Sequence, residues 1–263
     1  MNYSYNVSKL LLLALMTVTM GASQAECDPA AVEEALDDTS TTDETTGATC
    51  TPDVAVKSNL VFLLQGDALT STLSDGAAVA SVPDGSCNSG VTITQTSATN
   101  RPEFMANEIN GHAAIHMDGT DDYLSIPDPG QSLVNGVTAI SVLKIERLGG
   151  NEFILDKQGG DAGGFYLQLD TFGGNALTFM VGAGGIVATD ATLDTTNFHI
   201  VTTIGKPATG IYAGISAGVI LFRDGAYKNS SSSGYTPVDN AWDYTIGANH
   251  WASGINLHVK ASI

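Results

Sequence analysis

The run Phe165-Tyr166-Leu167-Gln168-Leu169-Asp170 decides the fold class, because apolar residues recur at every second position in it. Successive side chains of a β-strand point to opposite faces of the sheet, so Phe165, Leu167 and Leu169 share one face. Their neighbours share the other face, and we expect that face to contact water, as is common in antiparallel sheets. The run therefore predicts a strand that lies with one side on a hydrophobic core.

Similar short β-rich segments recur along the chain on both sides of this run. Their spacing of roughly 8 to 14 residues leaves no room for crossover helices and is typical of a sandwich of two antiparallel sheets. Residues 137–145 are apolar almost throughout, which predicts a strand buried on both faces or lying under a loop. The candidate strands are residues 59–64, 113–117, 123–126, 138–145, 153–156, 165–170, 176–181, 199–204, 219–223, 244–247 and 255–263.

Pairs of Asp or Asn with Gly separate many of these segments. Such pairs readily adopt the positive φ angles that tight hairpins need, so we expect them to form turns. The pairs are Asp75-Gly76, Asp84-Gly85, Asn110-Gly111, Asp118-Gly119, Asn135-Gly136 and Asp224-Gly225.

The composition limits both the number of domains and the kind of partner. The chain has 263 residues, and all-β sandwiches commonly use such a length as one domain. Its 10 basic residues face 28 acidic ones, which gives a formal net charge of -18 at pH 7. This charge repels the phosphate backbone of nucleic acids and anionic membrane surfaces. We therefore exclude nucleic acid as a partner.

Residues 1–25 have the pattern of an export signal. Lys9 supplies a positive flank, residues 10–20 are apolar, and Ser23-Gln24-Ala25 is a small-x-small cleavage site. The apolar run is shorter than the roughly 20 residues that cross a bilayer, so we predict cleavage before Glu26 rather than a membrane anchor. We expect a secreted or cell-surface protein without membrane insertion, with the periplasm as the alternative.

Residues 26–56 are expected to form an acidic, Thr-rich linker. The stretch from Glu26 to Asp53 carries nine carboxylates and no lysine or arginine, so it has little apolar surface to bury. An oxidising destination permits disulfides, and Cys27 with Cys50 is our preferred pairing, which leaves Cys87 alone. Three cysteines keep other pairings open.

The order of segments after the linker is similar to that of a known family. Arg101-Pro102, Asn110-Gly111 and the stretch Ala114-Ile115-His116-Met117-Asp118-Gly119-Thr120-Asp121-Asp122-Tyr123-Leu124 resemble the core motif of laminin G-like or concanavalin A-like domains of exported bacterial proteins. The resemblance continues through residues 137–143, 152–157, 221–225 and 244–248. It implies that residues 57–263 form one jelly-roll sandwich. Relatives continue past the strand in which this chain stops at Ile263, so the resemblance also implies a C-terminal truncation.

An acidic turn is the first candidate site. Asp118, Asp121 and Asp122 offer the hard oxygen ligands that Ca²⁺ prefers, and Ca²⁺ is the one cofactor that the sequence suggests. The alternative, which we favour, is that Asp118 and Asp121 accept backbone N–H bonds within a tight turn. Neither the spacing nor the number of ligands matches an EF-hand loop.

Aromatic residues near the C-terminus are the second candidate site. Sugar rings present apolar C–H faces that pack on aromatic planes, while neighbouring polar side chains bind the hydroxyl groups. For Trp251, which lies in a predicted loop, exposed binding and plain packing are equally compatible with the sequence, and Trp242 precedes a strand and is equally expected in the core. The candidate ligand-binding residues are Trp251, Asn249, His250, Trp242 and Tyr244.

The usual signatures of catalysis do not occur in the sequence. Retaining glycosidases need two carboxyl groups about 5 Å apart, and β-sandwich glucanases carry them on one strand as Glu-x-Asp-x-x-Glu. That pattern is missing, and the glutamate pairs Glu103 with Glu108 and Glu146 with Glu152 span predicted turns. We therefore name no catalytic residue and expect a protein that is not an enzyme.

These observations together favour a secreted or cell-surface module that binds polysaccharide or glycoprotein, assisted by Ca²⁺. The alternative is an adhesive or architectural domain of a larger surface protein, which the acidic linker and the abrupt C-terminus favour. A divergent glycoside hydrolase is the third hypothesis.

Overall fold

The computed structural model describes residues 13–16, 59–86, 91–158, 163–170, 175–182, 186–206, 218–232, 239–251 and 254–263, apart from the side chains at 13–16, 186–187, 251 and 256. The expected linker at 26–56, the Cys27–Cys50 pairing and Cys87 lie outside these residues. The described part is built from β-strands and three short 3-10 helices, η1 (Gly66–Leu69), η2 (Ala98–Asn100) and η3 (Leu133–Asn135).

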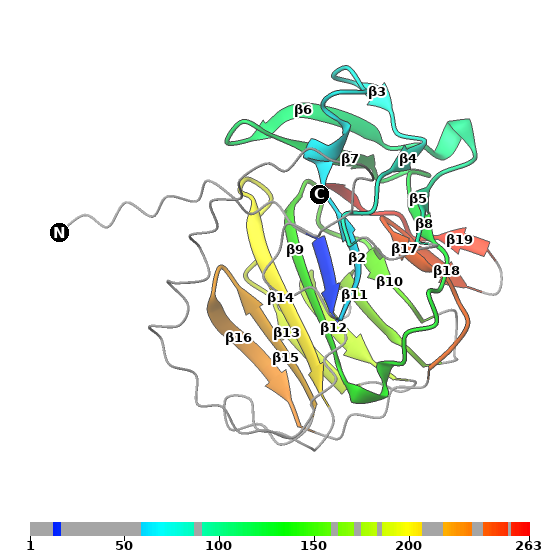
Figure 1. Cartoon of the computed structure of the whole chain (residues 1–263). Helices are drawn as coiled ribbons and strands as arrows, with labels where there is room; N and C mark the ends of the chain where they lie inside the picture. Colours follow the sequence, from blue (N-terminus) through cyan, green and yellow to red (C-terminus); the bar gives the residue numbers. More distant parts are fainter. Residues whose placement is uncertain are drawn as a thin grey trace, which may run out of the picture.

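The strands form two large antiparallel sheets (Figure 1). The first sheet follows the order β16-β15-β14-β9-β20-β7-β6-β3, and β1 pairs with β9 and β2 beside this path. Its strands are β1 (Leu13–Met16), β2 (Leu60–Leu64), β3 (Ala77–Ala78), β6 (Glu103–Ile109), β7 (His112–Asp118), β9 (Val137–Ile145), β14 (His199–Lys206), β15 (Gly218–Arg223), β16 (Ala226–Ser231) and β20 (Lys260–Ser262).

The second sheet follows the order β13-β12-β11-β10-β17-β8-β5-β4, and a separate hairpin pairs β18 with β19. The strands of the second sheet are β4 (Ser81–Val82), β5 (Ile93–Thr94), β8 (Leu124–Ile126), β10 (Glu152–Asp156), β11 (Phe165–Asp170), β12 (Ala176–Val181), β13 (Ile186–Asp190) and β17 (Tyr244–Ile246). The hairpin consists of β18 (Asn249–Trp251) and β19 (Gly254–Asn256).

One hydrophobic core joins the two sheets. Phe62 of β2 meets Tyr244 of β17 edge to face, with ring centroids 5.6 Å apart, and the ring of Phe165 lies 6.2 Å from that of Tyr244. All three rings are at most 1% exposed and belong to the same cluster of buried residues. The expected all-β, two-sheet antiparallel sandwich is therefore confirmed.

Two Asx-Gly pairs form the hairpin turns that the sequence predicts. Asn110 and Gly111 have φ angles of 50° and 87° between β6 and β7, and Asp224 and Gly225 have φ angles of 54° and 74° between β15 and β16. Positive φ at both central positions is the requirement of a type I′ turn, whose twist matches that of the paired strands.

The prediction that one face of β11 contacts water is wrong, because this strand is buried on both sides. Phe165, Leu167 and Leu169 lie in the core as predicted, but Tyr166 and Gln168 are only 9% and 8% exposed. The Tyr166 ring packs against Phe153 of β10 at 5.1 Å, and its hydroxyl reaches the sulfur of Met180. Side chains from neighbouring strands therefore cover the face that the alternation assigned to water.

The segment 255–263 is not one strand. Leu257 has a φ of 55°, a left-handed conformation that separates β19 from β20, and the two strands pair with different partners. The alternation of residue types also missed β3, β4, β5, β6, β13, β16 and β18, which are short or carry polar and small residues that obscure the period. The expected loop around Trp251 is therefore wrong in part, because Asn249 to Trp251 form β18.

The strand β1 lies within the segment that the sequence assigns to the export signal. Leu13 to Met16 pair with residues 60–64 of β2 on one side, and Ala14 to Met16 pair with residues 138–140 of β9 on the other. A cleaved signal would remove β1, and the backbone groups that it pairs in β2 and β9 would then need other partners.

Truncating Phe62 tests the core. Phe62→Ala should lower the free energy of unfolding by about 3–5 kcal/mol, because it removes a fully buried ring that joins both sheets. Urea denaturation measures the loss. Tyr227→Ala is the control, because that ring is 55% exposed on β16 and its removal should cost less than about 1.5 kcal/mol. Equal losses in the two variants would contradict this core.

Removing residues 1–25 tests the role of β1. Compared with the full chain, a chain that begins at Glu26 should exchange amide hydrogens faster at residues 60–64 and 138–140, because these strands lose the pairing to β1. Hydrogen exchange read by mass spectrometry measures this difference. Amides of β15 serve as the internal control, since β15 pairs only with β14 and β16, and unchanged exchange at 60–64 would contradict the pairing.

Candidate functional site

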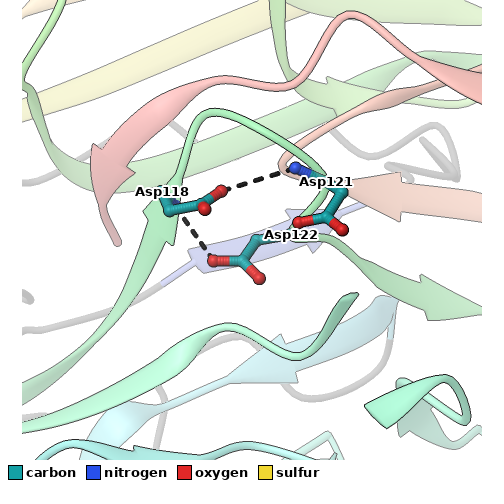
Figure 2. A group of neighbouring side chains, drawn as sticks. All are labelled: Asp118, Asp121 and Asp122. Carbon is teal, nitrogen blue, oxygen red and sulfur yellow. Dashed lines mark hydrogen bonds between the residues drawn. The ribbon is translucent and has the colours of Figure 1, made fainter. Parts of the chain in front are cut away.

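The acidic turn Asp118, Asp121 and Asp122 follows β7 and precedes β8 (Figure 2). One carboxylate oxygen from each residue lies within 4.8 Å of the others. Asp118 is exposed, Asp121 is half-buried, and Asp122 is 6% exposed. The turn therefore concentrates three negative charges, one of which is almost removed from water.

Two of these carboxylates fold the turn itself. The Asp118 carboxylate accepts hydrogen bonds from the backbone N–H groups of Thr120 at 2.7 Å and Asp121 at 3.4 Å. The Asp122 carboxylate accepts one from the N–H of Asp118 at 3.0 Å. Asp118 therefore accepts backbone N–H groups within the turn, as expected. The second carboxylate that does so is Asp122, whereas Asp121 was expected.

The pKa values of the two carboxyl groups move in opposite directions. Burial raises the pKa of Asp122 to about 6, and the charges of Asp118 and Asp121 add to this rise against the bond from Asp118 N–H. For Asp118, burial also acts to raise the pKa, but the hydrogen bonds from Thr120 and Asp121 outweigh it and lower the pKa. The turn thus holds a readily ionised and a reluctantly ionised carboxyl group side by side.

The oxygen atoms of the turn provide only part of a Ca²⁺ site. Ca²⁺ takes six to eight oxygen ligands at about 2.3–2.6 Å, so oxygens within 4.8 Å of one another can share one ion. One oxygen of Asp118 and one of Asp122 already accept backbone hydrogen bonds. A cation at this turn would be held by the remaining carboxylate oxygens and would need water molecules as its other ligands.

The acidic turn contacts the segment that follows the β18–β19 hairpin. His258 Nδ1 lies 3.0 Å from the carbonyl oxygen of Asp122, and the His258 ring lies 6.1 Å from that of Tyr123. Arg147 donates to the carbonyl of Gly119 at 3.1 Å. The acidic turn therefore contacts a residue that lies two positions after the end of β19.

The structure separates the five expected ligand-binding residues. Tyr244 is 0% exposed and Asn249 is 1% exposed, so neither side chain is available at the surface. The side chain of Trp251 lies outside the described residues. Trp242 and His250 remain, both half-buried, with their rings 4.9 Å apart and nearly perpendicular.

The hairpin is fixed to the second sheet beneath this aromatic pair. The backbone N–H of His250 donates to the carboxylate of Asp156 at 2.9 Å, and Asp156 is 1% exposed at the end of β10. Burial raises the pKa of Asp156 to about 6, which the hydrogen bonds from His250, Gln158 and Lys157 oppose. The Nδ1 atom of His250 is buried and has no hydrogen-bond partner in the described part of the chain.

Lys157 contacts the backbone of Trp242, and the sequence analysis did not identify it as a site residue. Its side chain is 0% exposed, and its ammonium group meets the carbonyl oxygens of Asn240 and Trp242 and the carboxylate of Asp128. The available signal was a lysine two positions after the apolar run Phe153-Ile154-Leu155, because a cation next to a buried strand needs polar partners.

Three of the four glutamates that were weighed as catalytic pairs form ion pairs. Lys144 bonds Glu108 at 2.5 Å and lies 3.8 Å from Glu146, and Arg147 bonds Glu152 at 2.7 Å. The expected turn between Glu103 and Glu108 is wrong, because both residues lie on β6. Glu152 also accepts a hydrogen bond from the N–H of Lys260.

The strand pairing defines a β-sandwich of the jelly-roll type. Its candidate sites are the aromatic pair Trp242–His250 and the acidic turn. No family model matches the sequence, and no curated protein matches it. Among solved structures, the chain is similar to domain 4 of AbnA, a GH43 extracellular arabinanase from Geobacillus stearothermophilus, in complex with arabinotriose. The TM-score is 0.46 and the identity 14%, over 72% of this chain and 92% of that chain. So weak a likeness does not establish a shared fold, and the sandwich rests on the strand pairing itself.

None of the helices in the described ranges is long and apolar enough to cross a bilayer.

The raised pKa of Asp122 predicts a pH-dependent stability. Its ordinary value is 3.8, so the folded state holds the proton more tightly and loses stability as the pH rises through about 6. Asp122→Asn keeps an oxygen acceptor for Asp118 N–H but cannot ionise. Thermal unfolding should therefore show a stability gain of the variant over the native chain that grows between pH 4 and pH 7. Asp121→Asn makes the same change of charge in the same turn as a control, and an equal pH trend in both variants would contradict this explanation.

Proposed function

We propose that the chain is an exported carbohydrate-binding module whose contact surface is the aromatic pair Trp242–His250 with the β18–β19 hairpin. The observation that carries this proposal is the half-buried Trp242 ring, which lies against His250 beside a group of polar side chains. Aromatic planes with polar neighbours suit sugars, whose rings have an apolar face and a polar edge.

Polar groups surround the pair in a fixed arrangement. Asn240 accepts a hydrogen bond from Trp242 N–H at 3.2 Å, and Asp243 accepts one from Asp128 N–H at 3.3 Å. Asp239 is exposed and Asp243 half-buried in the same segment. Carboxylates beside an aromatic plane provide acceptors for sugar hydroxyls.

The hairpin places further candidate residues next to the pair. In the β18–β19 ladder, His250 is paired with Ile255 and Trp251 with Gly254. Trp251 therefore follows directly on the residue that contacts Trp242, and we include it in the surface.

The net charge narrows the class of carbohydrate. A chain of charge -18 repels polyanions such as uronic acid polymers over most of its surface. The ligand that we propose is therefore a neutral polysaccharide or the neutral glycan of a glycoprotein.

Ca²⁺ would act on this surface through the acidic turn. A cation held by the acidic turn would fix the carbonyl of Asp122. This carbonyl contacts His258, which lies two residues after the end of β19. The ion would order the surface without touching the sugar.

Glycan binding tests the proposal. The chain should bind at least one neutral glycan on an array, and calorimetry with that glycan should show at least a tenfold loss for Trp242→Ala and Trp251→Ala, because each removes an aromatic plane. His250→Phe should preserve thermal stability, since it keeps the packing with Trp242 and removes a buried nitrogen that has no partner among the described residues.

Tyr227→Ala is the matched control, because this exposed aromatic residue belongs to β16 of the other sheet. It should bind as the native chain does. The proposal fails if no neutral glycan binds, or if Tyr227→Ala weakens binding as much as Trp242→Ala. The calcium step fails separately if EDTA and Asp121→Asn both leave the affinity unchanged.

A further inference from the structure

Lys157 is a fully buried amine in a polar pocket at the end of β10. Its Nζ lies 2.9 Å from the carbonyl oxygen of Asn240 and 3.2 Å from a carboxylate oxygen of Asp128. The same Nζ lies 4.8 Å from the centre of the Tyr244 ring. None of these contacts involves a side chain that we propose to bind carbohydrate, so carbohydrate binding does not explain why this amine is buried.

The side-chain amide of Asn240 faces this amine. Lys157 Nζ lies 3.3 Å from Asn240 Oδ1, which puts the amide carbon within about one further C=O bond length of 1.2 Å. The same Oδ1 accepts a hydrogen bond from the backbone N–H of Trp242 at 3.2 Å. A fixed N–H donor on a carbonyl oxygen stabilises the negative charge that develops there when a nucleophile attacks the carbon.

The leaving group and a proton carrier are also in place. The Nδ2 of Asn240 donates to the carbonyl oxygens of Lys157 at 3.1 Å and Gln158 at 3.3 Å, so the amide is held in one orientation. Asp128, whose carboxylate contacts Nζ, can take a proton from the amine and return one to the departing nitrogen.

A glycine permits this close approach. Gly164 has a φ of 83°, and a Cβ at that position would lie 2.3 Å from the carbonyl oxygen of Lys157 and 3.0 Å from Asn240 Nδ2. Any larger residue would push the Asn240 amide away from the strand end.

We propose that Lys157 and Asn240 form an intramolecular isopeptide bond, with Asp128 as the acid and base. Nζ attacks the side-chain carbonyl carbon of Asn240, the new N–C bond replaces the bond from that carbon to Nδ2, and one ammonia leaves. The one proton that the neutral Nζ loses passes through Asp128 to the leaving nitrogen, which departs as ammonia, so the reaction needs no oxidant or cofactor.

Burial supports the reactive form of the amine. Desolvation lowers the pKa of Lys157, opposed by the charges of Asp128, Asp239 and Asp243. A neutral amine is the nucleophile in amide formation, and its burial excludes the water that would compete with it.

The bond would link two neighbouring strands of the second sheet. Lys157 follows β10 and Asn240 precedes β17, and these strands pair at Leu155 with Ile246 and Asp156 with Thr245. Such a link fixes the segment that carries Trp242, and it closes a loop between residues that are 83 positions apart.

Intact mass spectrometry of the purified, denatured full chain tests the proposal. The mass should be lower than that of the sequence by one ammonia. A tryptic digest should contain residues 148–223 joined to residues 229–260, since the modified Lys157 no longer permits cleavage. A full-length mass equal to that of the sequence, with separate peptides in the digest, overturns the proposal whether or not any variant folds.

Variants separate the isopeptide bond from other losses of ammonia. Succinimide formation at an asparagine also releases ammonia, but it gives no joined peptide and does not need a lysine. Lys157→Arg and Asp128→Asn should therefore restore the unmodified mass, and Asp75→Asn, which removes an exposed carboxylate between η1 and β3, should keep both the mass loss and the joined peptide. A mass loss that persists in Lys157→Arg would assign it to a succinimide and overturn the proposal.

Discussion

The exclusion of water from the space between the two sheets is the constraint on which the rest of the structure depends. Phe62 of the first sheet and Tyr244 of the second meet edge to face in this space, and Phe165 packs on Tyr244 beside them. Each strand must keep its period of two so that its apolar side chains reach this layer. Turns and loops are then confined to the ends of the sandwich, where the candidate site residues lie.

The second sheet has a further requirement, because buried polar groups lie beside β10 and β17. Asp156 accepts the N–H of His250, and Lys157 is surrounded by carbonyl oxygens and the carboxylate of Asp128. A buried charge without such partners costs several kcal/mol, so these contacts fix the segments at 239–243 and 249–250 on the sheet. The aromatic pair Trp242–His250 is held in place by the two buried polar residues beneath it. The surface proposed for carbohydrate and the amine proposed to form an isopeptide bond are thus parts of one arrangement.

Two carboxylates of the acidic turn stabilise the turn itself. Asp118 and Asp122 accept backbone N–H groups within the turn, and Asp122 in turn presents its carbonyl to His258. A cation could use only the oxygens that remain. The presence of Asp118 and Asp122 in the motif is therefore explained by the turn that they form.

The sequence by itself determined the sandwich, its strands around Phe165 and the hairpin turns at Asn110-Gly111 and Asp224-Gly225. These features depend on local periodicity and on positive φ angles, which neighbouring residues encode. Only the tertiary structure decided that Tyr166 and Gln168 are covered, that Tyr244 and Asn249 are buried, and that Trp242 lies against His250. It also brought Lys157 to Asn240 and Asp128, which no spacing in the sequence connects. The physical reason is that burial and contact depend on which distant strands pack together, and the pattern of any one strand does not contain that information.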